Sequence, residues 1–254
     1  MRLKTKEDIK KIKESGKILV SILHKLRDIS APGVELSSLD KKAKEILSKH
    51  GAKSAFYGYR PSGASDPYPA YICTSVNDQI VHGTPTHYKL KEGDLLTIDI
   101  GVNKDGFIAD AAFTFGIGNI SKEAVRLLNS TNLALERAIS VMRPGNTLGD
   151  VGYEIETQIK KDKLKLINGL TGHGVGFELH ENPTVFNYGD KGTGMKLQEG
   201  MVLAIEPMVS TSSEDIIQDS DESFCTDDGS LSAHFEKTIA ITKNGYEILT
   251  PWNL

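Results

Sequence analysis

Four carboxylates occur inside apolar segments of the kind that form the core of a β-sheet. They are Asp99 in LLTIDI, Asp110 in FIADAAF, Glu206 in MVLAIEP and Glu236 in AHFEKTIAI. A carboxylate is costly to bury without a partner, because its charge loses its hydration. The apolar segments of this chain contain no matching set of lysine or arginine residues. The pattern therefore favours a metal site, and four acids could hold two ions.

The first two acids flank a predicted β-hairpin whose turn signal is Asp105-Gly106. If these residues form a two-residue turn, Asp110 faces Gly101 and Asp99 becomes its diagonal neighbour on the same face. If the turn shifts by one residue, Asp99 and Asp110 face each other directly. Both registers bring the two carboxylates within reach of one ion, whereas an odd-length loop or a bulge would separate them. The alternative for either acid alone is a solvent-facing position on a half-exposed strand.

Glu206 and Glu236 stand in runs typical of buried strands, so each needs a partner. A structural ion pair is the alternative to a metal at both positions. Lys237 follows Glu236 directly, but consecutive strand residues point to opposite faces. Lys237 should therefore not neutralise Glu236.

The segment TGHGVGFELHENP (171–183) has glycine at three alternate positions, which argues against a helix and for close approach of the backbone. His173 and His180 lie in this segment, and their pairing favours a ligand role over a structural one. His82, in QIVHG, is a weaker candidate by its spacing. The remaining histidines have no comparable setting and are interpreted as ordinary: His24, His50, His87 and His234.

Other chemistries and locations are disfavoured by the sequence. The chain has no phosphate-binding P-loop and no nucleophile elbow, and the glycine spacing at 172–176 does not fit a dinucleotide fingerprint. A net charge of -4 gives no basic surplus for nucleic acid. Two cysteines make no disulfide framework. With no signal-like N-terminus and no apolar run of membrane length, the sequence predicts a cytoplasmic protein.

Helical periodicity and end signals predict four helices, which cover residues 5–29, 36–48, 121 to before 144, and a stretch that begins at 147. Thr5 with Asp8 resembles a capping box at the start of the first helix. Strands are predicted around residues 70–76, 94–102, 107–117, 201–209 and 232–242. Loops are predicted at residues 58–69 and 211–230, where turn-forming and polar residues concentrate.

The order of these elements repeats along the chain. The segments APGVEL (31–36) and RPGNTL (143–148) each precede a helix, and Pro32 and Pro144 lie 112 positions apart. Pro-Gly before a helix is common, so the segments alone do not establish a repeat. Each half, however, ends in strands that carry two of the acids. We therefore expect a single domain over residues 1–254, with halves at about 1–118 and 119–254 and a site between them.

The ordered segments together resemble the type I methionine aminopeptidases, which are pita-bread metallopeptidases. The resemblance rests on both aspartates and on GHGVG, LHENP, MVLAIEP and SAHFE, and it extends from the first helix to about residue 249. It implies an α/β (α+β) pita-bread fold of two pseudo-symmetric halves with a dinuclear metal site between them. The two divalent ions would be Co, Mn, Fe or Zn, and the expected ligands are Asp99, Asp110, His173, Glu206 and Glu236.

The resemblance also implies roles for these residues. Asp99 would bind one ion and His173 with Glu206 the other, and Asp110 and Glu236 would bridge both. A water held between the ions would attack the first peptide carbonyl, with Glu206 taking and passing on its proton. His180 would stabilise the developing oxyanion, and His82 would bind the substrate at the scissile amide.

The expected walls of the substrate pocket are Tyr59, Tyr68, Cys73 and Leu179, and several positions near the site depart from the family pattern. Ala111-Ala112 follows Asp110 where the family usually has a hydroxyl, and Lys237 replaces a usual histidine. A tryptophan common near residues 222–223 is missing. The Tyr59–Tyr68 spacing indicates an insertion. These changes leave the ligands intact but put the pocket's shape in question.

The implied function is removal of the initiator methionine from nascent chains when the second residue is small. The expected partners are nascent N-termini, with the ribosome as a candidate, and the protein should be a monomer that needs neither nucleic acid nor a membrane. One alternative is an Xaa-Pro peptidase of the same fold, which usually carries an extra N-terminal domain. A second is a non-enzymatic binding protein of this fold, which would usually have lost ligands. A third is a Mg-dependent phosphoester hydrolase, which His173 and the lack of basic clamps disfavour.

Overall fold

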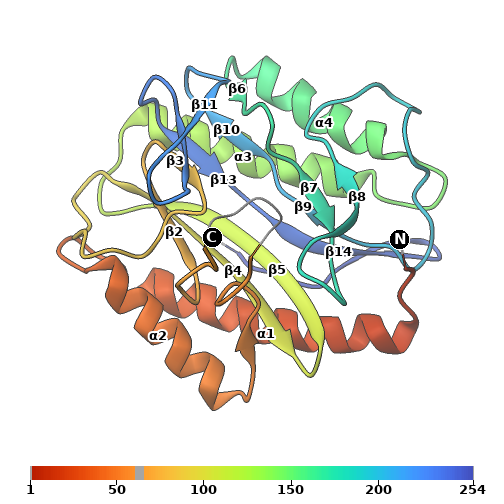
Figure 1. Cartoon of the computed structure of the whole chain (residues 1–254). Helices are drawn as coiled ribbons and strands as arrows, with labels where there is room; N and C mark the ends of the chain where they lie inside the picture. The colour runs from red at the N-terminus through yellow and green to blue at the C-terminus, as the bar shows by residue number, and fades with distance from the viewer. Residues whose placement is uncertain (1, 61–65, 254) are drawn as a thin grey trace.

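The computed structural model describes residues 2–60 and 66–253. Its helices are α1 (Lys6–Ile29), α2 (Leu36–Lys49), α3 (Lys122–Ser140) and α4 (Leu148–Lys161). Figure 1 shows α1 and α2 along one side of the strands and α3 and α4 along the other. All four predicted helices are thus present. The Thr5–Asp8 capping box is confirmed, since Thr5 accepts from the Asp8 N–H and the Asp8 carboxylate accepts from the Thr5 N–H.

The strands form four small sheets. The first contains β1 (Lys53–Ser54), β4 (Leu95–Lys104) and β2 (Cys73–Val76), with β5 (Phe107–Gly116) paired to β4. The largest has the order β15 (Gly245–Ile248), β14 (Lys237–Thr242), β9 (Val202–Ile205), β7 (Gly172–Gly174) and β8 (Glu181–Val185). A third joins β13 (Ser232–His234), β10 (Met208–Ser210) and β6 (Lys165–Leu166). The fourth joins β11 (Ile216–Gln218), β12 (Phe224–Thr226) and β3 (Gln79–Val81).

The β4–β5 hairpin has the register expected from a two-residue turn. Asp110 pairs with Gly101 and Asp99 with Ala112, so the two acids are diagonal neighbours on one face. The alternative, with the two acids directly opposite, does not occur. Asp105 and Gly106 both have positive φ values, of 53° and 87°, which suits the type I′ turns that match strand twist.

Glu206 and Glu236 both lie where the chain passes from one sheet to another. The strand predicted at 201–209 is divided at Glu206-Pro207 into β9 and β10, and the strand predicted at 232–242 is divided at Phe235-Glu236 into β13 and β14. The expectation of continuous strands is therefore wrong at these points. Pro207 lacks an N–H for a ladder, and the Glu236 N–H donates across to Ala112 of β5 instead.

The expectation that residues 211–230 form a loop is also wrong. This segment contains β11 and β12, which pair with each other, and β12 pairs with β3. Each strand has three residues, too few for a period-two pattern to be recognised. The pairing with β3 places Phe224 beside Val81, at the wall of the cavity described below.

The glycines of β7 allow its neighbours to approach closely, as the sequence predicted. A Cβ at Gly172 would lie 2.5 Å from the Ala204 carbonyl oxygen, and one at Gly174 would lie 2.5 Å from that of Asn182. Only glycine therefore lets β7 pass between β8 and β9. This packing holds His173, which lies between the two glycines, against Ala204 of β9.

The helices α2 and α4 match in position and length. Both α2 and α4 have 14 residues, and their bounds lie 112 positions apart, the offset of the two Pro-Gly segments. The short strands β1 and β6 follow them at the same offset. These facts agree with a repeat, and the division into halves stays a prediction. Within residues 2–60 and 66–253, no helix has the length and apolar character needed to cross a membrane.

Candidate metal centre

All the residues predicted for the site lie on the wall of one cavity of about 1530 Å³. They come from separate parts of the chain, and those that lie in strands belong to two of the sheets. The residues brought together are Tyr59, Tyr68, Cys73, His82, Asp99, Asp110, His173, Leu179, His180, Glu206 and Glu236.

The pKa values of the four carboxylates are set mainly by burial. Among the described residues, no lysine or arginine forms an ion pair with any of them. Burial raises the pKa of Asp110 to about 7 and the pKa values of Asp99, Glu206 and Glu236 well above their usual range. The negative charges nearby add to the increase at Asp99, Glu206 and Glu236. The structural ion pair considered for Glu206 and Glu236 is therefore absent from the described part of the chain.

The acids also retain free coordination capacity. One carboxylate oxygen of Asp99, of Asp110 and of Glu236 is buried without a hydrogen-bond partner. Oxygen atoms in this state are costly unless an ion or ligand satisfies them. Ligand atoms of Asp110, His173 and Glu236 all lie within 4.8 Å of one another. This donor set of carboxylate oxygens and one imidazole fits a divalent metal.

His173 is oriented for coordination. Its Nδ1 lies 2.9 Å from the Gly174 carbonyl oxygen, an acceptor, so Nδ1 carries the proton and Nε2 offers a lone pair. Nε2 lies 3.3 Å from Oε1 of Glu206. Burial lowers the pKa of His173, which favours the neutral imidazole that binds metals.

A side chain of β14 holds the hairpin backbone at Asp110 by two hydrogen bonds. Thr238 Oγ1 accepts from the Asp110 N–H at 2.9 Å and donates to the Asp110 carbonyl oxygen at 2.6 Å. A hydroxyl therefore holds the backbone of Asp110, although Ala111 and Ala112 provide none. Lys237, the other departure here, has its Nζ 4.0 Å from the centre of the Trp252 ring, away from Glu236.

His180 lies beside His173 at the rim of the cavity, with the ring centres 4.4 Å apart. Its Nδ1 is 2.8 Å from the Tyr59 hydroxyl. Desolvation, with His173 and His82 close by, lowers the pKa of His180 to about 3. A neutral His180 that accepts the Tyr59 proton at Nδ1 carries its own proton on Nε2, where it can donate to a substrate oxygen. Sequence reasoning assigned Tyr59 to the pocket wall alone.

The loop that holds His180 is anchored by the N-terminal segment. Lys4 forms a buried ion pair with Glu181, whose other oxygen accepts from the backbone N–H groups of Phe177 and Glu178. Gly176 lets the Lys4 side chain pass, since a Cβ there would lie 2.7 Å from it. This pair limits the movement of residues 176–181, so it also limits the movement of His180.

His82 lies on the cavity wall with a φ of 63°, a conformation few residues other than glycine adopt. Its ring packs on Phe224 with the centres 5.7 Å apart. Phe224 thus supplies an aromatic surface on the segment where the usual tryptophan is missing. Sequence reasoning overlooked Phe224 because its strand was interpreted as a loop.

The segment between Tyr59 and Tyr68, whose length predicts an insertion, is closed at its base. The Tyr68 N–H donates to the Tyr59 carbonyl, and the Gly58 N–H donates to the Tyr68 carbonyl. This segment includes residues 61–65, which lie outside the described residues, so the insertion stays a prediction. The Tyr68 hydroxyl donates toward the carbonyls of Ile72 and Gly83, so it holds the wall together.

Cys73 and Leu179 are buried and complete the apolar part of the wall. Both cysteines of the chain are free thiols, as expected. Burial raises the pKa of Cys73 well above its usual range, so this thiol is protonated and acts as a small apolar group.

The interpretation of His234 as an ordinary histidine is wrong. His234 is buried in the cavity wall, with Nε2 3.3 Å from Oε2 of Glu206. Burial lowers its pKa to about 3. In the sequence it stands in SAHFE, two residues before Glu236, and strand alternation would have placed it on the same face as that ligand. That signal was available but was not used.

Comparison with known proteins agrees with this geometry. Residues 10–243 match the family described as metallopeptidase family M24. A methionine aminopeptidase of Clostridium perfringens is 42% identical over 249 residues, which are 98% of each chain. The crystal structure of methionine aminopeptidase from Thermotoga maritima superposes with a TM-score of 0.94 at 41% identity and covers 98% of this chain and 99% of that one. Prolidase from Pyrococcus furiosus shares the fold, with a TM-score of 0.78 at 22% identity, and this chain covers 66% of its length.

Proposed function

The chain belongs to metallopeptidase family M24, and from this premise we propose that the cavity holds two divalent ions and releases the N-terminal methionine of nascent chains. Similarity over the full length to methionine aminopeptidases makes the protein a metal-dependent aminopeptidase of the pita-bread fold. The Xaa-Pro alternative is not favoured, because the prolidase similarity extends only to the fold.

The observation that carries the proposal is that the five expected ligand residues lie in one cavity, where no described lysine or arginine forms an ion pair with their carboxylates. Asp99 would hold one ion, His173 and Glu206 the other, and Asp110 and Glu236 both. The ions would be Co, Mn, Fe or Zn, which oxygen-rich sites with a single imidazole accept. When bound, such ions lower the pKa of a water and polarise a carbonyl oxygen.

Three side chains of the protein can transfer protons, donate hydrogen bonds and position the substrate. Glu206 lies on the cavity wall and can accept a proton from the attacking water and return it to the leaving amine. His180 can donate from Nε2 to the carbonyl oxygen as negative charge develops there, with Tyr59 holding the ring. His82 faces the same cavity and can bind the scissile amide.

The apolar wall matches a methionine side chain. Cys73, Leu179, Tyr68 and Phe224 offer surfaces of sulfur, aliphatic and aromatic character, which suit an unbranched thioether. We propose that a small second residue is preferred. The substrates would be chains leaving the ribosome in the cytoplasm, and the protein would act as a monomer, which light scattering after gel filtration can test.

Hydrolysis of matched peptides by the metal-stripped protein tests the proposal. Peptides beginning Met-Gly, Met-Leu, Ala-Gly and Ala-Pro would be compared with and without added Mn²⁺ or Co²⁺. We expect metal-dependent release of methionine, fastest from Met-Gly. Cleavage of Ala-Pro instead would establish the Xaa-Pro alternative, and metal binding without release from any peptide would establish a binding protein.

A further inference from the structure

His234 is a buried imidazole of the cavity that the proposed reaction does not use. Neither of its ring nitrogens has a hydrogen-bond partner, and its exposed fraction is 1%. Nε2 lies 3.3 Å from Oε2 of Glu206. A buried polar group without a partner is unusual in native proteins and calls for an explanation.

The position of His234 is fixed by the strands around it. It pairs with Met208 across β13 and β10. The Thr114 hydroxyl accepts from the His234 N–H at 2.8 Å, donates to the His234 carbonyl at 3.0 Å, and lies 2.7 Å from the Thr97 hydroxyl. Two hydroxyls of the β4–β5 hairpin therefore hold the backbone that carries this ring. Groups on such rigid elements can be held to the tolerance that a functional site needs.

The two oxygens of Glu206 each face one imidazole. His173 Nε2 is 3.3 Å from Oε1, and His234 Nε2 is 3.3 Å from Oε2. His173 has its proton on Nδ1, directed at the Gly174 carbonyl, so its Nε2 cannot donate to Glu206. Of these two rings, only His234 can supply an N–H to the carboxylate. An ionised carboxylate accepts such bonds strongly.

We propose that His234 is a positioning residue: its Nε2–H holds Oε2 of Glu206, which leaves Oε1 directed at the metal on the His173 side. This inference rests on the proposed metal centre. The ligand atoms that lie within 4.8 Å of one another belong to Asp110, His173 and Glu236. In this proposal His234 acts on that group through Glu206, whose Oε2 its Nε2 faces at 3.3 Å, and not as a ligand itself. Partners that orient ligating carboxylates in this way affect metal affinity strongly.

Two substitutions at His234 separate the effect of its N–H donor from the effect of its ring volume. H234Q keeps an N–H donor of similar reach, whereas H234L fills the space without one. Titration calorimetry of Co²⁺ into the metal-free proteins should show H234L binding about 10–100-fold more weakly than the unchanged protein, with H234Q restored to within about threefold. The loss in H234L should appear mainly in kcat, because the methionine pocket is unaltered. H50L, on the exposed end of α2, is the matched histidine control and should bind normally.

The visible spectrum of the Co²⁺-loaded proteins decides between positioning and ligation. H234Q should keep the spectrum of the unchanged protein. Co²⁺ affinity and kcat in H234L equal to those of the unchanged protein would overturn the proposal. A changed spectrum in H234Q would also overturn it, since His234 would then be a direct ligand.

A second measurement needs no substitution and so does not depend on a variant that folds. In the Zn²⁺-loaded protein, nitrogen NMR of labelled histidine reports which ring nitrogen of His234 carries the proton. The proposal requires Nε2–H, and a proton on Nδ1 would overturn it. Failure of the proposed function would appear separately, as an unchanged protein that binds Co²⁺ but releases no methionine.

Discussion

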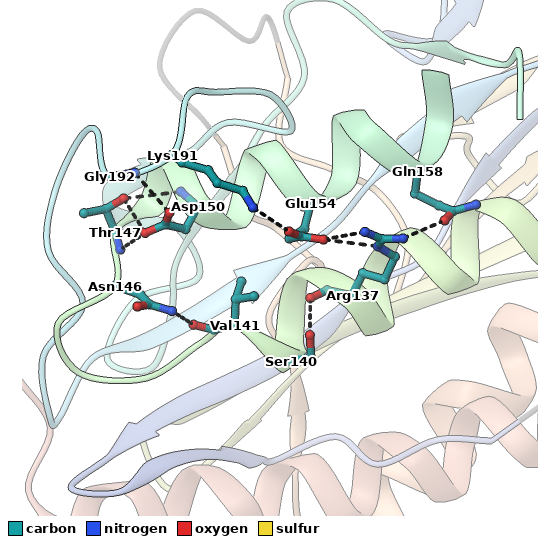
Figure 2. A network of polar contacts seen from close by, with 10 residues as sticks. All are labelled: Arg137, Ser140, Val141, Asn146, Thr147, Asp150, Glu154, Gln158, Lys191 and Gly192. Atoms are coloured by element: carbon teal, nitrogen blue, oxygen red, sulfur yellow. Dashed lines mark hydrogen bonds and ion pairs between the residues drawn. The ribbon is translucent and has the colours of Figure 1, made fainter. Parts of the chain in front are cut away.

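Two groups of carboxylates in this protein, one on the outer helices and one in the cavity, have opposite electrostatic surroundings. On the outer helices, Glu154 of α4 accepts from Nε and Nη2 of Arg137 at 3.1 and 2.8 Å, and Lys191 lies 3.7 Å from its other oxygen (Figure 2). In the cavity, none of the four acids has a lysine or arginine partner within the described ranges. In the described part of the chain, the carboxylate that joins two helices therefore has cationic partners, whereas the converging carboxylates have no lysine or arginine partner.

The same difference appears between Asp150 of the helical network and Asp110 of the cavity. At the start of α4, Asp150 accepts from the N–H groups of Thr147 and Gly192, and these bonds lower its pKa (Figure 2). Asp110 is as well fixed in its backbone, yet its pKa rises to about 7. Local hydrogen bonds therefore stabilise the charge of one aspartate, and burial opposes the charge of the other. A site whose charges the protein leaves uncompensated is prepared for an external cation.

The largest effect should follow from removing one bridging acid. D110N should lower kcat/KM by 10³-fold or more, an order of magnitude typical of essential catalytic groups, and should weaken binding of both ions. Peptide assays and metal titration would measure this. D105N, which changes an exposed acid in the turn of the same hairpin, is the control and should stay active. Full activity of D110N would refute the metal assignment.

A smaller effect is expected on stability, as a function of pH. The pKa of Asp110 is about 7 in the folded state and 3.8 in the reference state, so between these values the folded protein retains a proton that the unfolded chain has lost. The contribution of this group to stability is therefore complete below about pH 4 and is lost as the pH rises to about 7. Relative to D110N, the metal-free unchanged protein should lose a few kcal/mol across this window.

Denaturant unfolding of both metal-free proteins between pH 4 and 7.5 would measure this difference. The other buried carboxylates and the histidines titrate in both proteins, and the difference between the two proteins therefore includes the coupling of Asp99, Glu206 and Glu236 to Asp110. Added Mn²⁺ at pH 7 should raise the unfolding temperature of the unchanged protein more than that of D110N. A stability difference that does not change with pH would contradict the account.

A still smaller effect is expected from the hydrogen bond between Tyr59 and His180 on the cavity wall. Y59F removes the hydroxyl that lies 2.8 Å from Nδ1 of His180. One neutral hydrogen bond contributes about 1 kcal/mol, so kcat should fall roughly 5–10-fold with little change in KM. Metal affinity should not change. Y57F, on an exposed neighbouring ring, is the control, and equal kcat in both variants would exclude the orienting role.

The smallest effect should occur in the helical network. E154Q removes the charge that Arg137 and Lys191 share, and it should cost about 0.5–1 kcal/mol of unfolding free energy, because the pairs are partly exposed. Activity and metal affinity should stay unchanged. Thermal unfolding at low and high salt would measure the effect. A large loss of activity in E154Q would mean that the two groups of acids are coupled.

By itself the sequence determined the helices and the β4–β5 hairpin, and it singled out the four acids that the cavity brings together. Caps and periodicity act within a few residues, and the Asp105-Gly106 turn sets the register of Asp99 and Asp110, so these features can be predicted locally. The acids could be recognised because a carboxylate is unusual inside an apolar segment of the kind that surrounds each of them. The roles of Tyr59, Tyr68, Cys73 and Leu179 came only from the family resemblance.

Only the tertiary structure decided how these parts meet. The division of two predicted strands at Glu206 and Glu236, the pairing of β12 with β3, and the placement of His234 all depend on residues far apart in the chain. The Tyr59–His180 contact joins residues 121 positions apart. No local propensity encodes such contacts, because their energy comes from burial and pairing that exist only once the sheets have assembled.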